Sequence, residues 1–443
     1  MHTRPLQAVP VVGQVLLKKI SLALIVWISI WVFISGLLVV KIPAAFSKVY
    51  AEDGLALQVA LEKSFPHDFL LPYAGYFDVV WRSGGRVAAM LPLEYASQTF
   101  FFFNTLMLSW IALTVFHASS EFIHSRVSRA FFSLSLVFLP IASFESIANT
   151  TNLHFFFMSA CLPIFLRKGF TRYETYTFSF FVLVATLSTP LMIFYFPLIV
   201  FLRWSSKFPK RLSRPKLTES AWVVGILFQT VFILTFALGD RTSLGINSIG
   251  KSSYLYLDRV VGSTLIPWWG NVSQGTPSIA PNLFPAPVYL GLRALFAFAI
   301  LSLLLLWIVK STSKKSEVRV IATGVLLTGF FYWLIVGTLF NPEPRYAIYP
   351  SFGLLLILFY SKGGCEERRM SKSYFPAMFT IILLTWIGSW NPSSLRVNGP
   401  TWISEYKNAQ VKCQAQGGQV SIPIIPTNLD WFVTIDCKKI TPL

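Results

Sequence analysis

The sequence predicts an all-α polytopic membrane protein with about 11 transmembrane helices, and three observations lead to this fold class. Hydrophobic residues make up 54% of the 443 residues, charged residues only 13%, and the mean hydropathy is +0.60. A soluble globular domain cannot bury so much apolar surface. Apolar runs of about span length recur between charge clusters, and the lysines and arginines concentrate in alternate short loops.

The expected spans are the apolar runs between these clusters. We place them near 20–40, 94–116, 130–147, 150–166, 175–188, 190–204, 220–238, 286–309, 319–340, 345–360 and 374–390. The first run has span length and lacks a small-residue cleavage site after it, so we expect it to be retained. The stretches 130–166 and 175–204 are each divided into two spans, because both of their ends are basic and their middles carry no cation.

The basic loops predict the orientation in the membrane. Lys18 and Lys19 place the amino terminus in the cytoplasm, and the basic loops 310–319 and 362–372 fall on the same side. The formal charge of +18 is then mostly a topology signal, which disfavours a nucleic-acid partner. We expect a transmembrane domain over 1–390, with large outer loops at 41–93 and 239–285, and a small non-cytoplasmic tail at 391–443.

The outer segments carry a helical pattern in the first loop and a pair of cysteines in the tail. In the first outer loop Leu57, Ala60 and Leu61 recur at helical spacing, which predicts short interfacial helices on the membrane surface. In the tail, Cys413 and Cys437 are the two cysteines on the oxidising side of the membrane, so we expect them to form a disulfide.

The first candidate for chemistry is the carboxylate pair Glu52 and Asp53, just past the first span. One interpretation is local: Asp53 caps a helix that starts at Gly54, and Glu52 is solvated near the same helix end. The functional interpretation is general-base catalysis, in which a carboxylate accepts the proton of an attacking hydroxyl at the membrane surface. The two interpretations are compatible, because a cap fixes the position of its carboxylate.

Arginines form the second group of candidates. Arg345, in "NPEPRYAIYP", opens a predicted span at the outer boundary, where its guanidinium could hold a phosphate beside Tyr346. The alternative is an arginine that extends to the interface among tyrosines. Arg82 and Arg86 lie one helical turn apart and could contact the same phosphate, although a solvated helix face explains them as well.

A third cluster, "FESIANTTNLHFF", brings Glu145 and His154 to an outer hairpin together with two asparagines. Polar groups at membrane depth are candidates for function, although a polar turn that needs its backbone groups paired explains them nearly as well. The sequence shows no outer Asp-x-Asp or other metal-binding constellation, so neither a metal nor another cofactor is expected.

The layout resembles the GT-C superfamily of membrane glycosyltransferases, which includes protein O-mannosyltransferase-like enzymes and bacterial relatives. The resemblance rests on a cytoplasmic amino terminus, one span, the Glu52–Asp53 pair opening a large outer loop, many further spans, and the "HFFF" and "EPRY" segments. It implies that Asp53, or its partner Glu52, is the catalytic base and that Arg345 contacts the phosphate of a polyprenyl-phosphate sugar donor.

The function expected from these observations is transfer of that sugar to a glycan or lipid acceptor on the outer face of the bacterial cytoplasmic membrane. Membrane lipid and the polyprenyl-linked donor are the implied partners. A lipid-linked sugar transporter or flippase, an O-antigen-type polymerase and a non-catalytic scaffold remain as alternatives. A transporter should carry buried charges in the middle of its spans, and the sequence has few of these.

Overall fold

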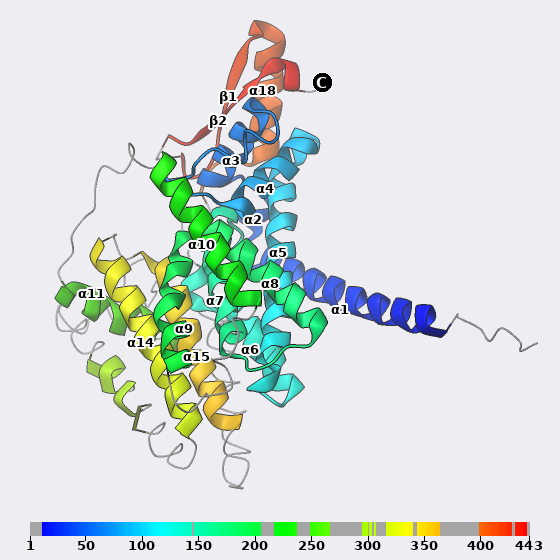
Figure 1. The fold of residues 1–443 in the computed structure, drawn as a ribbon. Helices are drawn as coiled ribbons and strands as arrows, with labels where there is room; N and C mark the ends of the chain where they lie inside the picture. The colour runs from blue at the N-terminus through cyan, green and yellow to red at the C-terminus, as the bar shows by residue number, and fades with distance from the viewer. Residues whose placement is uncertain are drawn as a thin grey trace, which may run out of the picture.

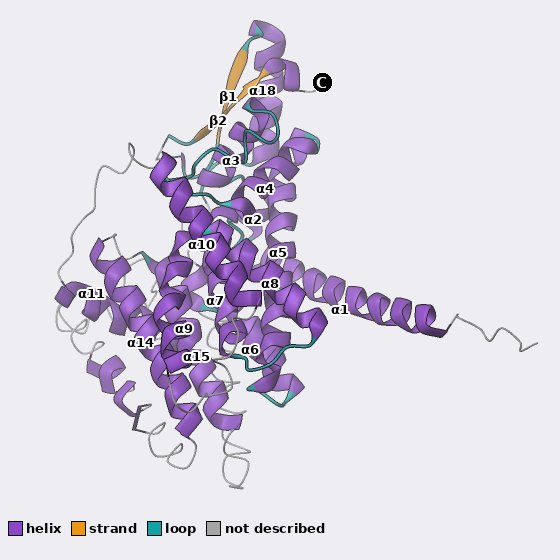
Figure 2. Cartoon of the chain, in the orientation of Figure 1, coloured by secondary structure: helices purple, strands orange, loops and turns teal. Residues whose placement is uncertain are grey.

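The computed structural model describes residues 11–143, 146–204, 217–236, 249–265, 295–299, 301–303, 305–306, 316–339, 343–363, 398–427 and 430–440. Most of these residues are helical, and the helices form a bundle with a small α/β unit at one end (Figure 1, Figure 2). Most of the predicted span 286–309 and all of 374–390 lie outside the described residues.

The elements follow one another in this order. The α-helices are α1 (Val11–Lys41), α2 (Pro43–Ser47), α3 (Ala51–Glu62), α4 (Val79–Met90), α5 (Ala96–Ala118), α6 (Arg126–Phe138), α7 (Leu153–Leu166), α8 (Arg172–Ser188), α9 (Tyr195–Trp204), α10 (Leu217–Phe236), α11 (Ile249–Leu255), α12 (Ser263–Leu265), α14 (Ser316–Leu339), α15 (Ile348–Gly363) and α18 (Trp402–Gln416). Short 3₁₀ turns include η1 (Leu93–Tyr95), η4 (Thr150–Asn152), η5 (Pro190–Phe194), η9 (Pro344–Ala347) and η11 (Cys437–Lys439), and a π-helical segment, η7, covers Tyr256–Gly262. The strands are β1 (Gln419–Pro423) and β2 (Phe432–Asp436).

Among the described residues, three helices are long and apolar enough to cross a membrane: Leu93–Glu121, Leu217–Phe236 and Val318–Thr338. A fourth span is possible if α8 and the following segment Pro190–Trp204, which meet at 118°, count as one. The helices α6 and α7 have 13 and 14 residues, fewer than the roughly 20 needed to cross the hydrocarbon layer. The structure thus supports membrane association, and the count of 11 spans stays a prediction.

The helix α7 forms the centre of the bundle. All of its 14 residues are buried, which is the pattern of a helix covered on every side. It packs against α5, α8 and α15, and Figure 1 shows it in the middle of the bundle. Because η4 leads directly into α7, the polar turn before the helix is fixed to the most buried part of the fold.

The tail forms a small unit of its own on the first outer loop. Strands β1 and β2 pair antiparallel, and the disulfide between Cys413 and Cys437 joins α18 to the end of β2, as predicted. The indole N–H of Trp402 donates to the carbonyl oxygen of Leu93 at 2.6 Å. A second hydrophobic core, which includes Leu57 of α3 and Ile422 of the tail, unites the two segments (Figure 1).

Candidate functional site

The acidic pair lies in the first turn of α3. The helix begins at Ala51, with Tyr50 as the N-cap residue and no side-chain cap, so the interpretation of Asp53 as the cap of a helix starting at Gly54 is wrong. Asp53 is 2% exposed, and its Oδ1 accepts the backbone N–H of Thr150 at 3.0 Å. This hydrogen bond joins the start of α3 to the polar turn η4.

Two adjacent glycines of α4 allow this convergence. A Cβ atom on Gly85 would lie 2.5 Å from the carbonyl oxygen of Ala56, and one on Gly84 would lie 2.7 Å from Cγ2 of Thr150. Real Cβ atoms do not approach other atoms so closely, because the van der Waals repulsion is too strong. The sequence "SGGR" therefore lets α4 pack simultaneously on α3 and on η4, with Asp53 at the junction.

Asp78 and His154 form a buried pair beside this junction. Asp78 caps α4 by accepting the N–H of Trp81 at 3.0 Å, and its Oδ2 lies 3.8 Å from Nδ1 of His154. Burial raises the pKa of Asp78, while His154, the Trp81 N–H and Arg82 oppose the rise. The ring of Tyr76 meets the His154 ring edge-on at 6.3 Å. Sequence analysis did not select Asp78, although its position before an amphipathic helix is typical of a cap.

Arg345 and Tyr346 reach the same region from η9. Arg345 forms an ion pair with Glu343, its guanidinium lies 5.8 Å from the centre of the Tyr346 ring, and its side chain is 23% exposed. Tyr346 contacts Phe155, the neighbour of His154, edge-on at 5.2 Å. The predicted residues Arg345, Tyr346 and His154 are thus brought together.

Tyr73 connects the acidic pair to Arg345. Burial raises the pKa of the Tyr73 hydroxyl well above its ordinary value, the charges of Glu52 and Asp78 raise it further, and the charge of Arg345 opposes them. Two acids of the first outer loop and an arginine far along the sequence therefore act electrostatically on one hydroxyl. Local sequence does not single out Tyr73 or Tyr76; the only signal is their place in the turn "YAGY", which ends two residues before Asp78.

The structure separates the two predicted arginines of α4. Arg82 is 3% exposed, so the interpretation of a solvated face is wrong for it. Its Nη2 donates to the carbonyl oxygens of Leu71 and Pro72 at 2.8 and 3.2 Å, and burial lowers its pKa to about 10. Arg86 instead pairs with the buried carboxylate of Asp68 at 2.5 Å. The two guanidiniums therefore do not act on one shared group.

Several buried polar atoms in this region have no hydrogen-bond partner. They are Glu52 Oε2, Asp78 Oδ2, Arg82 Nε and Nη1, Asn149 Nδ2, Thr151 Oγ1 and His154 Nδ1. Buried polar atoms are normally paired, so their concentration at the junction of α3, α4 and η4 is a reason to place a polar ligand or water there. We call this group, together with Asp53, Tyr73, Arg345 and Tyr346, the loop-junction site.

Two further predictions concern Glu145 and metal binding. Glu145 lies outside the described residues. No group of three or more His, Cys, Asp or Glu side chains suited to a metal ion occurs in the described part of the chain. Comparison with known proteins adds no relative, since no family model matches the chain and no curated protein or solved structure shows significant similarity to it.

Proposed function

We propose that the chain is a GT-C-type membrane glycosyltransferase with about 11 spans, which transfers a sugar from a polyprenyl-phosphate donor to a cell-envelope acceptor on the outer face of the bacterial cytoplasmic membrane. The observation that carries the proposal is the loop-junction site itself, where Glu52 Oε2 is buried without a hydrogen-bond partner and the charges of Glu52 and Arg345 both act on the Tyr73 hydroxyl. A base for the acceptor and a cation for the leaving group are the two charges that such a transfer requires.

The proposed reaction is a direct displacement at the anomeric carbon. The acceptor oxygen forms the new bond to this carbon as the bond to the donor phosphate oxygen breaks. A carboxylate takes the acceptor proton, and the polyprenyl phosphate leaves with the bonding electron pair. The guanidinium of Arg345 stabilises the negative charge that develops on this phosphate.

Geometry favours Glu52 over Asp53 as the base. Asp53 is almost fully buried and already accepts a backbone N–H, so its role is to hold the first turn of α3 against η4. Glu52 is partly exposed, its Oε2 has no partner, and its charge acts on Tyr73. The sequence favours Asp53 as the catalytic base. We propose instead that Glu52 is the base and that Asp53 holds it in position.

Arg345 is suited to bind a phosphate in exchange for an existing contact. Its ion pair with Glu343 is partly exposed on both sides, and such pairs contribute little to stability. A phosphate on the donor can replace this carboxylate or join it, because a guanidinium has five N–H donors. Tyr346 and the aromatic ring of Phe155 then form an apolar wall beside the phosphate.

The proposal is tested in cells that lack the gene and are complemented with the wild type or with Glu52→Gln. The expected result is that polyprenyl-phosphate sugar accumulates, and an envelope glycan loses a residue, in both the deletion and the Glu52→Gln strain. A transporter would tolerate Glu52→Gln, since its function does not need a base at this position. An unchanged lipid-linked sugar pool and an unchanged envelope in the deletion strain would exclude the transferase.

A further inference from the structure

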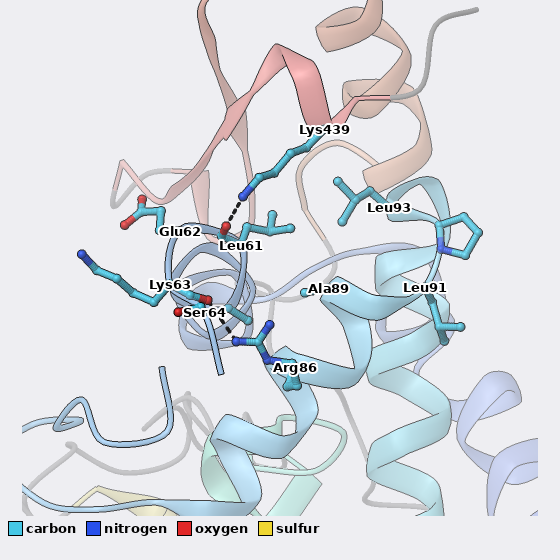
Figure 3. Close-up of a pocket in the computed structure, with 11 residues that line it drawn as sticks. Leu61, Glu62, Lys63, Ser64, Arg86, Ala89, Leu91, Leu93 and Lys439 are labelled. Carbon is cyan, nitrogen blue, oxygen red and sulfur yellow. Dashed lines mark hydrogen bonds between the residues drawn. The ribbon is translucent and has the colours of Figure 1, made fainter. Parts of the chain in front are cut away.

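A cavity of about 540 Å³ lies at the carboxyl ends of α3 and α4, whereas the loop-junction site uses residues nearer the amino ends of the same helices. It is lined by Ala60, Leu61, Glu62, Lys63, Ser64, Arg86, Ala89, Leu91, Pro92, Leu93 and Lys439. Figure 3 shows that these residues come from the ends of α3 and α4, from the start of the next helix, and from the tail. The loop-junction site includes none of these residues, and we call this cavity the tail pocket.

Two cations border the tail pocket. The Lys439 ammonium reaches from the tail and donates to the carbonyl oxygen of Leu61, and Nη2 of Arg86 donates to the carbonyl oxygen of Lys63 at 3.0 Å (Figure 3). An ammonium carries three N–H donors and a guanidinium five, so both groups keep donors beyond these bonds. Figure 3 also shows the side chains of Glu62 and Lys63 directed away from the pocket. Asp68, which does not line the pocket, offsets the charge of Arg86, whereas Lys439 has no carboxylate partner among the described residues.

Apolar side chains separate the two cations. Leu61 and Ala89 lie between Lys439 and Arg86 in Figure 3, and Leu93 lies to one side of them. Beside the pocket, Met90 is 76% exposed and Tyr95 is 50% exposed. Exposed apolar groups next to lysine and arginine are typical of surfaces that contact lipid headgroups and the upper acyl chains.

The position of the pocket along α5 agrees with this chemistry. The candidate span Leu93–Glu121 has 29 residues, which corresponds to about 43 Å of helix. A bilayer with its headgroup layers is about 40–45 Å thick. Leu93, which lines the tail pocket, is therefore at the level of the headgroups if this helix crosses the membrane.

We propose that the tail pocket binds the phosphate-bearing headgroup of an anionic phospholipid. Lys439 supplies the main attraction for the phosphate, Arg86 contributes N–H donors on the opposite side, and the leucines that line the pocket contact the glycerol and the first methylenes. This binding does not depend on glycosyl transfer. It gives the lipid around the protein a direct contact with the tail and with α3.

The test measures lipid binding to the detergent-purified full-length chain by native mass spectrometry, with phosphatidylglycerol and phosphatidylcholine as probes. The expected result is tighter binding of phosphatidylglycerol, weakened about fivefold by Lys439→Gln, as for one cation near a lipid phosphate. Lys438→Gln is the matched control, because Lys438 is the adjacent exposed lysine and does not line the pocket. Ala89→Leu fills the cavity without a change of charge and should also weaken binding.

The proposal is overturned by equal binding of the two lipids, by equal losses in the Lys438 and Lys439 variants, or by unchanged binding in Ala89→Leu. Displacement of the lipid by an equal concentration of glycerol 3-phosphate would also overturn it, because the site would then serve a soluble phosphate. If Ala89→Leu does not fold, the comparison of the two lysine variants decides alone.

Discussion

Ile424 of the tail packs directly against Gly54 of α3: a Cβ atom on Gly54 would lie 2.3 Å from Cδ1 of Ile424. Next to this contact the N–H of Ala51 donates to the carbonyl oxygen of Ile425 at 2.6 Å, and the N–H of Ile425 donates to Val49 at 3.2 Å. Ala51 has φ of 27°, in the left-handed region that non-glycine residues rarely adopt. The tail thus holds the turn that carries Glu52 and Asp53 in an unfavourable backbone conformation.

Gly54→Ala should displace the tail from α3. The added methyl overlaps Ile424, and overpacking of a core contact of this kind costs about 1–3 kcal/mol. We expect a lower thermal midpoint for the detergent-purified chain and faster proteolysis within 398–440. Gly36→Ala is the control, since a methyl there meets nothing within 4 Å. Equal behaviour of the two variants would contradict the packing described here.

Replacing both Cys413 and Cys437 with serine should loosen the same unit. The disulfide closes a loop with a sequence separation of 24, and such a crosslink stabilises by roughly 3 kcal/mol in the chain-entropy estimate. We expect proteolysis of the tail to accelerate in the double variant, and reductant to have the same effect on the wild type. Reductant should not affect the double variant further. If the wild type with reductant stays resistant, the tail is held by packing alone.

The start of α3 shows why local signals could not place the candidate site. Capping preferences predict a helix that begins after Asp53, because Asp is a favoured N-cap. The helix begins earlier, at Ala51. The N–H of Ala51 donates to the carbonyl oxygen of Ile425, more than 370 residues further along the chain. The existence of α3 and α4 and the pairing of Cys413 with Cys437 follow from periodicity and compartment, which are properties of the sequence itself.

The two arginines of α4 show that local sequence does not determine side-chain partners either. Helical spacing places Arg82 and Arg86 on one face, which is correct, but it does not determine their partners. The chain before α4 folds back over this face and supplies the carbonyls of Leu71 and Pro72 to one arginine and Asp68 to the other. Likewise, no local pattern links Tyr73 to Glu52 and Arg345, because only the tertiary structure brings the charge of Arg345, more than 270 residues further along the chain, to act on Tyr73.

Asp78→Asn should change how stability depends on pH. Burial raises the pKa of Asp78 in the folded protein, so the folded state keeps the proton at a pH where the unfolded state has released it. The wild type therefore loses stability as pH rises from about 4 through the raised pKa, and the Asn variant lacks this loss. Asn keeps an oxygen for the Trp81 N–H.

The measurement is the difference in thermal midpoint between the Asp78→Asn variant and the wild type from pH 4 to pH 7. The thermal midpoint of the variant minus that of the wild type should increase as pH rises. Groups that do not interact with Asp78 titrate alike in both proteins and cancel in the comparison. Parallel pH profiles would show that the folded environment of Asp78 does not disfavour its charge.

The predicted orientation places the tail outside the cell and the start of α8 in the cytoplasm. Single cysteines at the exposed positions Lys407 and Arg172, in a Cys365→Ser background, distinguish the two sides. A membrane-impermeant maleimide should label Lys407→Cys in intact spheroplasts and Arg172→Cys only after permeabilisation. Cys161 is buried in α7 and should not react. Labelling of both positions from the same side would exclude the proposed number of spans between them.

Separate substitutions in the acidic pair distinguish the base from the positioning residue. Glu52→Gln removes the proposed proton acceptor with little change in size, so sugar transfer should fall by roughly a hundredfold or more at unchanged expression. Asp53→Asn keeps an oxygen that can accept the N–H of Thr150, so its loss should be smaller. Asp53→Ala leaves that buried N–H without a partner, which costs about 1–3 kcal/mol of stability.

Glu62→Gln, an exposed acid on the same helix, is the matched control and should transfer sugar normally. The assay follows labelled sugar from the polyprenyl-phosphate pool into envelope glycan in membranes of each strain. An inactive Asp53→Asn with an active Glu52→Gln would return the base to Asp53, as the sequence alone suggests. Full activity in both would remove the acidic pair from the mechanism, since neither carboxylate would then be needed to accept the proton of the attacking hydroxyl.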